Sequence, residues 1–185
     1  MSQGAVRRKD KEMSRAEIED FLGRAAYGHI ASTDEAGQPY VIPDLFVYAE
    51  GKVWIHTSVA GHFQANIERN PRVCFEASEM GTIFPYGEFE CDTTVSYASV
   101  VGFGRISVEA ANEAKARFFD RFMAKYGDPK WPARPKGFYP RLDHVTVYRI
   151  DLETVTGKKG PLPQIADRWP AKNLTKSPGA KPPRN

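Results

Sequence analysis

The chain has few cysteines, little net charge and no apolar run long enough to cross a membrane. Two cysteines, Cys74 and Cys91, in 185 residues do not make a disulfide framework. The formal net charge is +3, and much of the basic excess lies near the two ends, which indicates solvated ends rather than a nucleic-acid-binding face. The first twelve residues are polar and lack the apolar centre of a signal peptide. We therefore expect a cytoplasmic, soluble protein that binds neither nucleic acid nor membrane.

Recognisable catalytic and metal-binding motifs are also missing. The four histidines, His29, His56, His62 and His144, form no closely spaced helical pair, and no thiolates or carboxylates cluster with them in sequence. We therefore expect no metal site. No Gly-x-Ser-x-Gly turn is present to hold a nucleophile, and Gly102-x-Gly104 is not followed by a helix, as a dinucleotide site requires. The sequence thus indicates no particular catalytic side chain.

The composition, with 41% hydrophobic and 26% charged residues, is that of an ordinary globular domain. Ser14 and Glu17 form a capping-box pattern for a short amphipathic helix that Gly23 is expected to end. Further helices are expected directly after Gly61 and over residues 110–126. We expect a flexible tail over residues 1–13, a folded domain over 14–155 and an extended, Pro- and Lys-rich tail over 156–185.

Six segments separated by turns have the pattern of strands. They cover residues 27–33, 40–48, 53–57, 72–77, 96–108 and 143–152. The second segment is apolar on both faces, so we expect both to be covered, with Asp44 pairing at a rim. Gly102 and Gly104 indicate either a bend or room for a flat ligand. The spacing predicts a mainly β fold, a six-stranded antiparallel barrel with flanking helices.

The most informative segment is the strand, loop and helix between Trp54 and Phe75. The helix expected after Gly61 begins with backbone N–H groups that lack intrahelical partners and carry the positive end of the helix dipole. Thr57, Ser58 and His62 are hydrogen-bond donors around this point. Because such helix starts bind phosphate readily, the pattern predicts a phosphorylated cofactor here.

Several motifs follow one another in a defined order. They are Gly37–Pro43, Ile55–Ser58, Ala60–Phe63, Asn70–Phe75 and Ser96–Gly104. In this order they resemble the pyridoxamine 5′-phosphate oxidase-related family of FMN-binding split barrels, in the branch similar to nitroimidazole-resistance proteins, over residues 15–152. The resemblance implies a six-stranded split barrel, FMN as the cofactor and a homodimer with the flavin at the subunit interface.

The resemblance also implies where the flavin is held. The implied contacts are the backbone of Val41, Ile42 and Pro43 at the isoalloxazine edge; His56, Thr57 and Ser58 along the ring and ribityl chain; Gly61, His62 and Asn66 at the phosphate; and Tyr97, Ser99 and Val100 contributed by the second subunit. Since the flavin does the redox chemistry, no side chain has to be catalytic.

Two departures from the family bear on the activity. Where the oxidases proper carry Ser-Arg-Lys, this chain has Gly61-His62-Phe63, and their Arg-rich C-terminal pattern for binding substrate is missing. Oxidation of pyridoxamine phosphate is therefore not expected. We expect an FMN-dependent oxidoreductase or reductase of small molecules, with a nicotinamide or deazaflavin as reductant. The alternative is a non-enzymatic flavin- or haem-binding module with His29, His56 or His62 as the haem ligand. The substrate, and whether the C-terminal tail covers the site, stay open.

Overall fold

The structure is a computed structural model that describes residues 5–84, 93–128, 130, 139 and 142–162. The chain divides into two compact units. The first comprises residues 1–79 and 98–159, and the second residues 80–97 and 160–185. Each is described by itself. No helix in the described part of the chain is long and apolar enough to cross a membrane.

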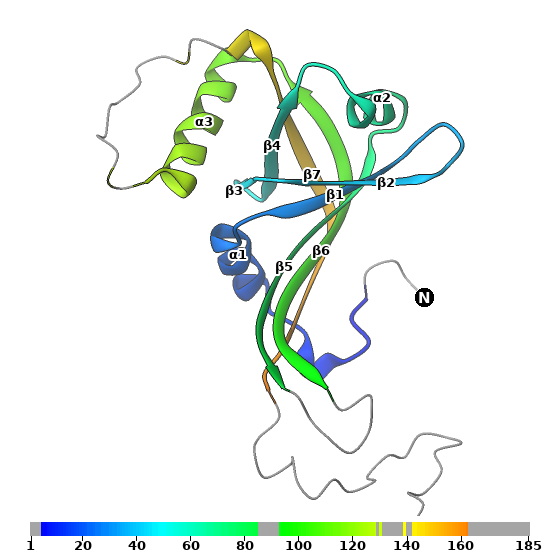
Figure 1. Ribbon diagram of the computed structural model, residues 1–185, viewed down its shortest axis with the longest axis vertical. Helices are drawn as coiled ribbons and strands as arrows, with labels where there is room; N and C mark the ends of the chain where they lie inside the picture. Colours follow the sequence, from blue (N-terminus) through cyan, green and yellow to red (C-terminus); the bar gives the residue numbers. More distant parts are fainter. Residues whose placement is uncertain (1–4, 85–92, 129, 131–138, 140–141, 163–185) are drawn as a thin grey trace, which may run out of the picture. The chain divides into compact units, whose positions relative to one another are not determined.

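The described residues form three α-helices and seven strands (Figure 1). The helices are α1 (Arg15–Arg24), α2 (His62–Arg69) and α3 (Asn112–Tyr126), with short 3-10 turns η1 (Lys9–Lys11) and η2 (Leu142–His144). The strands are β1 (Gly28–Thr33), β2 (Pro39–Asp44), β3 (Val47–Ala49), β4 (Lys52–Ser58), β5 (Arg72–Phe84), β6 (Thr94–Glu109) and β7 (Val145–Gly160). The prediction of a mainly β fold with flanking helices is confirmed.

The strands form one sheet in the order β2-β1-β5-β6-β7-β4-β3. The strands β2 and β3 stand at opposite ends of this order, yet only Leu45 and Phe46 separate them in sequence. The chain therefore joins the two edges of the sheet and closes it into a barrel. The single strand predicted over residues 40–48 is thus two strands. The first pairs antiparallel with β1 and the second with β4, so the strand count is seven instead of six.

Two strands continue further than the sequence indicates. The strand β5 runs to Phe84, past residue 77, where the sequence pattern predicts its end. The strand β7 runs to Gly160, past the domain end expected at residue 155. There the Met13 N–H donates to the Gly157 carbonyl at 2.9 Å, which ties the end of β7 to the segment before α1. Residues 156–160 are therefore strand and not tail, and residues 163–185 lie outside the described residues.

The helix α1 begins as its capping box predicts. The Ser14 Oγ accepts from the Glu17 N–H at 3.3 Å, and the Glu17 carboxylate accepts from the Ser14 N–H at 2.8 Å. The helix continues through Gly23 to Arg24, so the expected end at Gly23 is wrong. Ile18, Phe21 and Leu22 face the barrel core, as their spacing indicates.

Two apolar clusters hold the first unit together. The larger fills the barrel and takes in α1 and α2, with Phe21, Phe46 and Phe75 fully or almost fully buried. The smaller lies on the outer face of β4 and β7. There Phe118 of α3 packs with Trp54 and its neighbours, so α3 covers that face of the sheet (Figure 1).

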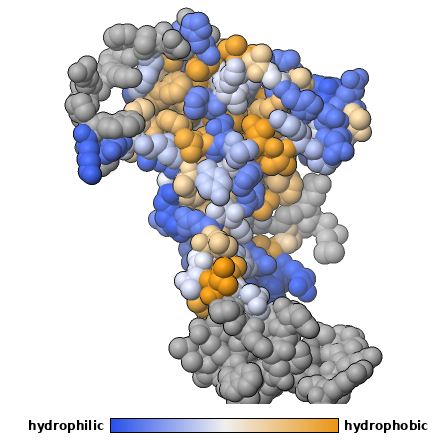
Figure 2. Space-filling model, in the orientation of Figure 1, coloured by the Kyte–Doolittle hydropathy of each residue, from blue (hydrophilic) through white to orange (hydrophobic). Residues whose placement is uncertain are grey.

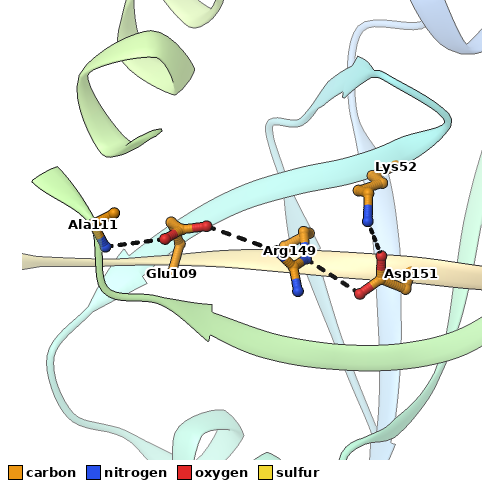
Figure 3. A network of polar contacts seen from close by, with 5 residues as sticks. All are labelled: Lys52, Glu109, Ala111, Arg149 and Asp151. Atoms are coloured by element: carbon orange, nitrogen blue, oxygen red, sulfur yellow. Dashed lines mark hydrogen bonds and ion pairs between the residues drawn. The ribbon is translucent and has the colours of Figure 1, made fainter. Parts of the chain in front are cut away.

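A chain of polar contacts fixes the start of α3 to the barrel (Figure 3). The Glu109 carboxylate accepts from the Ala111 N–H at 3.0 Å and lies 3.8 Å from the Arg149 guanidinium. The Arg149 Nε donates to Asp151 at 3.2 Å, and Asp151 also binds Lys52 of β4. These contacts join the end of β6, just before α3, to inner residues of β7 and to the start of β4.

Close approach of two strands explains the glycines of β6. A Cβ on Gly104 would lie 2.1 Å from the Asp151 carbonyl oxygen, and one on Gly102 would lie 2.9 Å from the Leu152 side chain. The space that these glycines leave is therefore taken by β7 and not by a ligand. The close approach of β7 thus explains both glycines.

The described part of the second unit consists of the adjoining ends of three strands. The Thr82 N–H donates to the Ser96 Oγ at 3.0 Å, and the Tyr97 ring lies against Gly160. Cys91 lies outside the described residues.

Candidate functional site

The start of α2 is open, as the sequence predicts. Gly61 is the N-cap residue, with a φ of 152° that favours glycine, and no atom lies within 4 Å of the position its Cβ would take. No side chain caps the helix, and residues 58–62 are exposed. The unpaired N–H groups of the first turn are therefore accessible to an anion.

His62 brings this helix start next to β2. Its imidazole contacts the Tyr40 ring edge-on, with the ring centroids 4.5 Å apart. Tyr40 directly precedes the Val41–Pro43 segment on β2, which the family resemblance assigns to the same site from a different motif. The fold therefore brings two of the four predicted groups of flavin contacts side by side.

The strand β2 has one face turned outwards. Ile42 packs against the barrel core, whereas Val41 is 54% exposed and Pro43 is also exposed. Among the described residues of one subunit this face is uncovered, whereas the sequence pattern predicts that both faces are covered. In the hydrogen-bonded order β2 is an edge strand, which suits its two prolines and leaves alternate backbone groups unpaired by the sheet.

The residues of the predicted ribityl group point in different directions. His56 lies under α3, with its ring 5.1–5.8 Å from the rings of Phe118, Phe119 and Phe122. Its Nδ1 is buried without a hydrogen-bond partner among the described residues, and burial lowers the pKa of the imidazole. Thr57 is on the opposite face of β4, as strand alternation requires. Only Ser58 stands exposed beside the loop.

Asn66 lies beneath α2 and not at its start. Its side chain is almost fully buried, its Nδ2 donates to the Ser32 Oγ at 3.2 Å, and its Oδ1 accepts from Arg69 at 3.4 Å. It lies one helical turn after His62 and is buried with Phe63 and Ile67 on the core-facing side of α2. Its assignment to the phosphate stays a prediction.

The fourth group of predicted contacts lies elsewhere on the chain. Ser99 lines a pocket of about 270 Å³ together with Val101, Thr156 and residues before α1. Val100 is fully buried in the core. Tyr97 belongs to the second unit. Their assignment to the flavin of another subunit stays a prediction.

Polar side chains gather at the corner between β2 and β3, where the sequence analysis named only Asp44. Asp44 does not pair there. One carboxylate oxygen accepts from the Leu45 N–H at 2.8 Å, the other is buried without a partner among the described residues, and burial raises its pKa to about 6. Nearby, the Lys125 Nζ and the Tyr126 hydroxyl donate to the Phe46 carbonyl at 3.0 and 2.7 Å. Burial lowers the pKa of Lys125 to about 8.

No group of three or more His, Cys, Asp or Glu residues in the described part of the chain is placed to hold a metal ion. Two of these residue types do form a pair, because His29 Nδ1 lies 2.9 Å from a Glu76 carboxylate oxygen. Cys74 is a free thiol whose pKa is raised by burial and by Glu76.

Comparison with known proteins gives a consistent result for the fold. The sequence model of the pyridoxamine 5′-phosphate oxidase family matches residues 14–159. None of the curated proteins matches the chain.

Three solved structures are similar. A candidate 5-nitroimidazole antibiotic resistance protein from Bacteroides thetaiotaomicron is 22% identical, with a TM-score of 0.67 over 80% of this chain and 86% of that one. A flavocytochrome from Azotobacter vinelandii is 18% identical, with a TM-score of 0.73 over 98% and 88%. An FAD- and haem-binding protein from Mycobacterium smegmatis is 19% identical, with a TM-score of 0.68 over 85% and 77%. At these identities the likeness shows the split-barrel fold.

Proposed function

Because the chain belongs to the pyridoxamine 5′-phosphate oxidase family, we propose that it binds FMN and acts as an FMN-dependent oxidoreductase of small molecules. The observation that carries the proposal is the open start of α2 beside the exposed edge strand β2. This arrangement joins a site for an anion to a site for a flat ring. FMN is a flat ring with an anionic tail.

The phosphate would lie at the start of α2. The exposed N–H groups of its first turn donate to anionic oxygens, and Gly61 leaves room for close approach. The exposed Ser58 and His62 stand beside these amides and can add two side-chain donors. With no arginine or lysine among residues 56–63, the backbone would provide most of the binding.

The isoalloxazine ring would lie against β2. Backbone groups of Val41, Ile42 and Pro43 that the sheet leaves unpaired suit the pyrimidine edge of the ring, and the apolar side chains of Val41 and Pro43 suit its face. When bound, FMN supplies the redox chemistry. The chain would bind and orient it, with a nicotinamide or deazaflavin as the reductant and no catalytic side chain of its own.

The proposed assembly is a homodimer with the flavin between the subunits. Val41, Leu45 and Val59 are exposed apolar side chains on and around β2 and the start of α2. Figure 2 shows that apolar and hydrophilic residues are interspersed on the face of the molecule that it draws. A second copy placed over this region would bury them together with the ring, and Tyr97, Ser99 and Val100 are its proposed contribution.

A haem-binding module is the second candidate, favoured by the two relatives whose names include a flavocytochrome and a haem-binding protein. The three histidines differ in accessibility. His29 is paired with Glu76, and His56 is packed under three phenylalanine rings. His62 is exposed and is the histidine that fits an axial ligand without displacing α3. A Soret band on haem titration that disappears in His62→Ala would favour this function over FMN binding.

The test of the phosphate site compares FMN with riboflavin, which has the same ring but no phosphate. His62→Ala should weaken FMN binding by about tenfold to a hundredfold, the loss of one charge-assisted hydrogen bond, and should leave riboflavin binding unchanged. Fluorescence quenching of each flavin measures both affinities. The exposed His144 provides the control, and His144→Ala should change neither. Equal losses for FMN and riboflavin would remove His62 from the phosphate.

A further inference from the structure

A pocket of about 310 Å³ lies on the outer face of β1, β5 and β6, within the first unit. The apolar side chains that line it are those of Ala31, Pro39, Cys74 and Phe103. Among the described residues at this pocket, Pro39 alone comes from β2, and none comes from the start of α2. The pocket therefore uses neither the Val41–Pro43 segment nor the helix start that is proposed to hold the flavin.

Two arginines lie opposite each other at the edge of this pocket. The Ile106 N–H donates to the Pro71 carbonyl at 2.9 Å, and the end of β5 contacts the start of β6, so the two strands are antiparallel. In this register the next pair is Arg72 with Arg105. Because Ile106 points into the barrel core, strand alternation turns Arg105 outwards. Both arginines are exposed on the same face of the sheet.

Neither guanidinium group has a hydrogen-bond or ion-pair partner among the described residues. Glu76 lies on the same face of β5, but it is engaged with His29 Nδ1 at 2.9 Å. No acidic residue is found among the described residues that line the pocket. Since like charges directly opposite each other on paired strands are destabilising, an anion placed between Arg72 and Arg105 would be stabilised by both and would remove their repulsion.

Thr33 adds a hydroxyl group to the same pocket. Its Oγ1 accepts from the Asn70 Nδ2 at 3.3 Å, so its own proton can be donated to another acceptor. Thr33 and Arg72 line the pocket together. A guanidinium group binds a carboxylate through two parallel N–H···O bonds, and the hydroxyl can donate a further one. The polar end of the pocket is therefore suited to a carboxylate.

We propose that this pocket binds a small aromatic carboxylate. The carboxylate pairs with Arg72 and Arg105, and the ring lies against Phe103, Cys74 and Pro39. Aromatic rings pack favourably on phenylalanine and on cysteine sulfur. A concave site with apolar walls and a few polar groups at one end is typical of small-molecule pockets. The apolar walls favour such a ligand over an inorganic anion, which would use only the arginines.

The test uses benzoate as the probe and the full-length protein labelled with nitrogen-15. Saturable shifts of the amide signals of residues 72–74 and 103–105 are expected. Benzamide, which has the ring without the charge, and acetate, which has the charge without the ring, should bind at least about tenfold more weakly. The absence of a saturable shift with benzoate would overturn the proposal. Either control probe binding as tightly as benzoate would do the same.

Two variants assign the binding to the named arginines. Arg72→Gln and Arg105→Gln should each weaken benzoate binding by about tenfold, while Arg117→Gln, at an exposed arginine on α3, should leave it unchanged. Because all three side chains are exposed, we expect the variants to fold, and their amide spectra away from the pocket should match the parent. Unchanged affinity in Arg72→Gln or Arg105→Gln would contradict the proposed site. FMN is not needed for this experiment, so its outcome is independent of flavin binding.

Discussion

At the scale of single residues, Asp44 is the group most at odds with its surroundings. Its carboxyl is partly buried at the β2–β3 corner, and burial raises the pKa to about 6 from an ordinary value of 3.8. The folded state therefore holds the proton more tightly than the unfolded chain. Stability is highest below pH 4 as far as this group is concerned, and it falls as the pH rises from about 4 to 6.

Asp44→Asn removes this ionisation while keeping the oxygen that accepts from the Leu45 N–H. We expect the variant to be more stable than the parent at pH 7 by about 1–2 kcal/mol, once the partial exposure of the carboxyl is taken into account, and equally stable at pH 4. Urea denaturation at both pH values measures the difference. Glu35→Gln, at an exposed carboxylate, should show no effect at either pH. A gain in stability that is the same at pH 4 and pH 7 would exclude ionisation as its cause.

The local structure around the predicted site residues could be read from the sequence in some places and not in others, for a physical reason. A helix start after Gly61 is readable because glycine, the preceding strand and the apolar spacing of Phe63 and Ile67 are all local signals. The surroundings of the His56 side chain cannot be read from the neighbouring sequence. Strand alternation sets it opposite Thr57, but only the packing of α3, more than fifty residues later in the chain, shows that this face is covered.

At the scale of elements, α3 covers His56 and the outer face of β4. Phe118 is 2% exposed and central to this cluster. Phe118→Ala should destabilise the fold by about 3–4 kcal/mol and should raise the lowered pKa of His56, because water then reaches the imidazole. Chemical denaturation and an NMR titration of His56 measure the two effects. Met123→Ala, on the exposed side of α3, should cost less than about 1 kcal/mol. An unchanged His56 pKa in Phe118→Ala would show that α3 does not cause the shift.

Two glycines in different elements test why β6 contains glycine. Gly104→Ala places a methyl group against the Asp151 carbonyl and should cost at least about 2 kcal/mol. Gly23→Ala lies inside α1 with nothing within 4 Å and should stabilise by about 0.5–1 kcal/mol. Thermal unfolding compares the two variants. A well-tolerated Gly104→Ala would indicate that β6 and β7 separate easily at this point.

Element boundaries were predictable where local chemistry sets them and not where pairing does. The capping box of Ser14 and Glu17 gave the start of α1. The break at Leu45 and Phe46 could not be read, since both sides continue an apolar strand pattern. The division arises because β2 pairs with β1 and β3 pairs with β4. Likewise, the end of β7 could not be read, because β7 pairs with β6 and contacts the segment before α1, both of which are distant in the sequence.

At the scale of the whole molecule, the exposed apolar face of β2 predicts self-association. We expect a species of twice the chain mass of 20.7 kDa by light scattering. Val41→Lys should shift this species towards the monomer by placing a charge in the proposed interface. Met123→Lys, at an apolar side chain that is also exposed but lies on α3, should leave the dimer intact. A wild-type protein that stays monomeric at high concentration would contradict the proposed assembly.

The central claim is that the start of α2 and the edge of β2 together hold FMN. Its most direct test is the visible absorption spectrum of the protein after incubation with excess FMN and removal of the unbound cofactor. We predict a yellow protein that holds one FMN per chain and releases it on denaturation. A protein that stays colourless under these conditions would contradict the account.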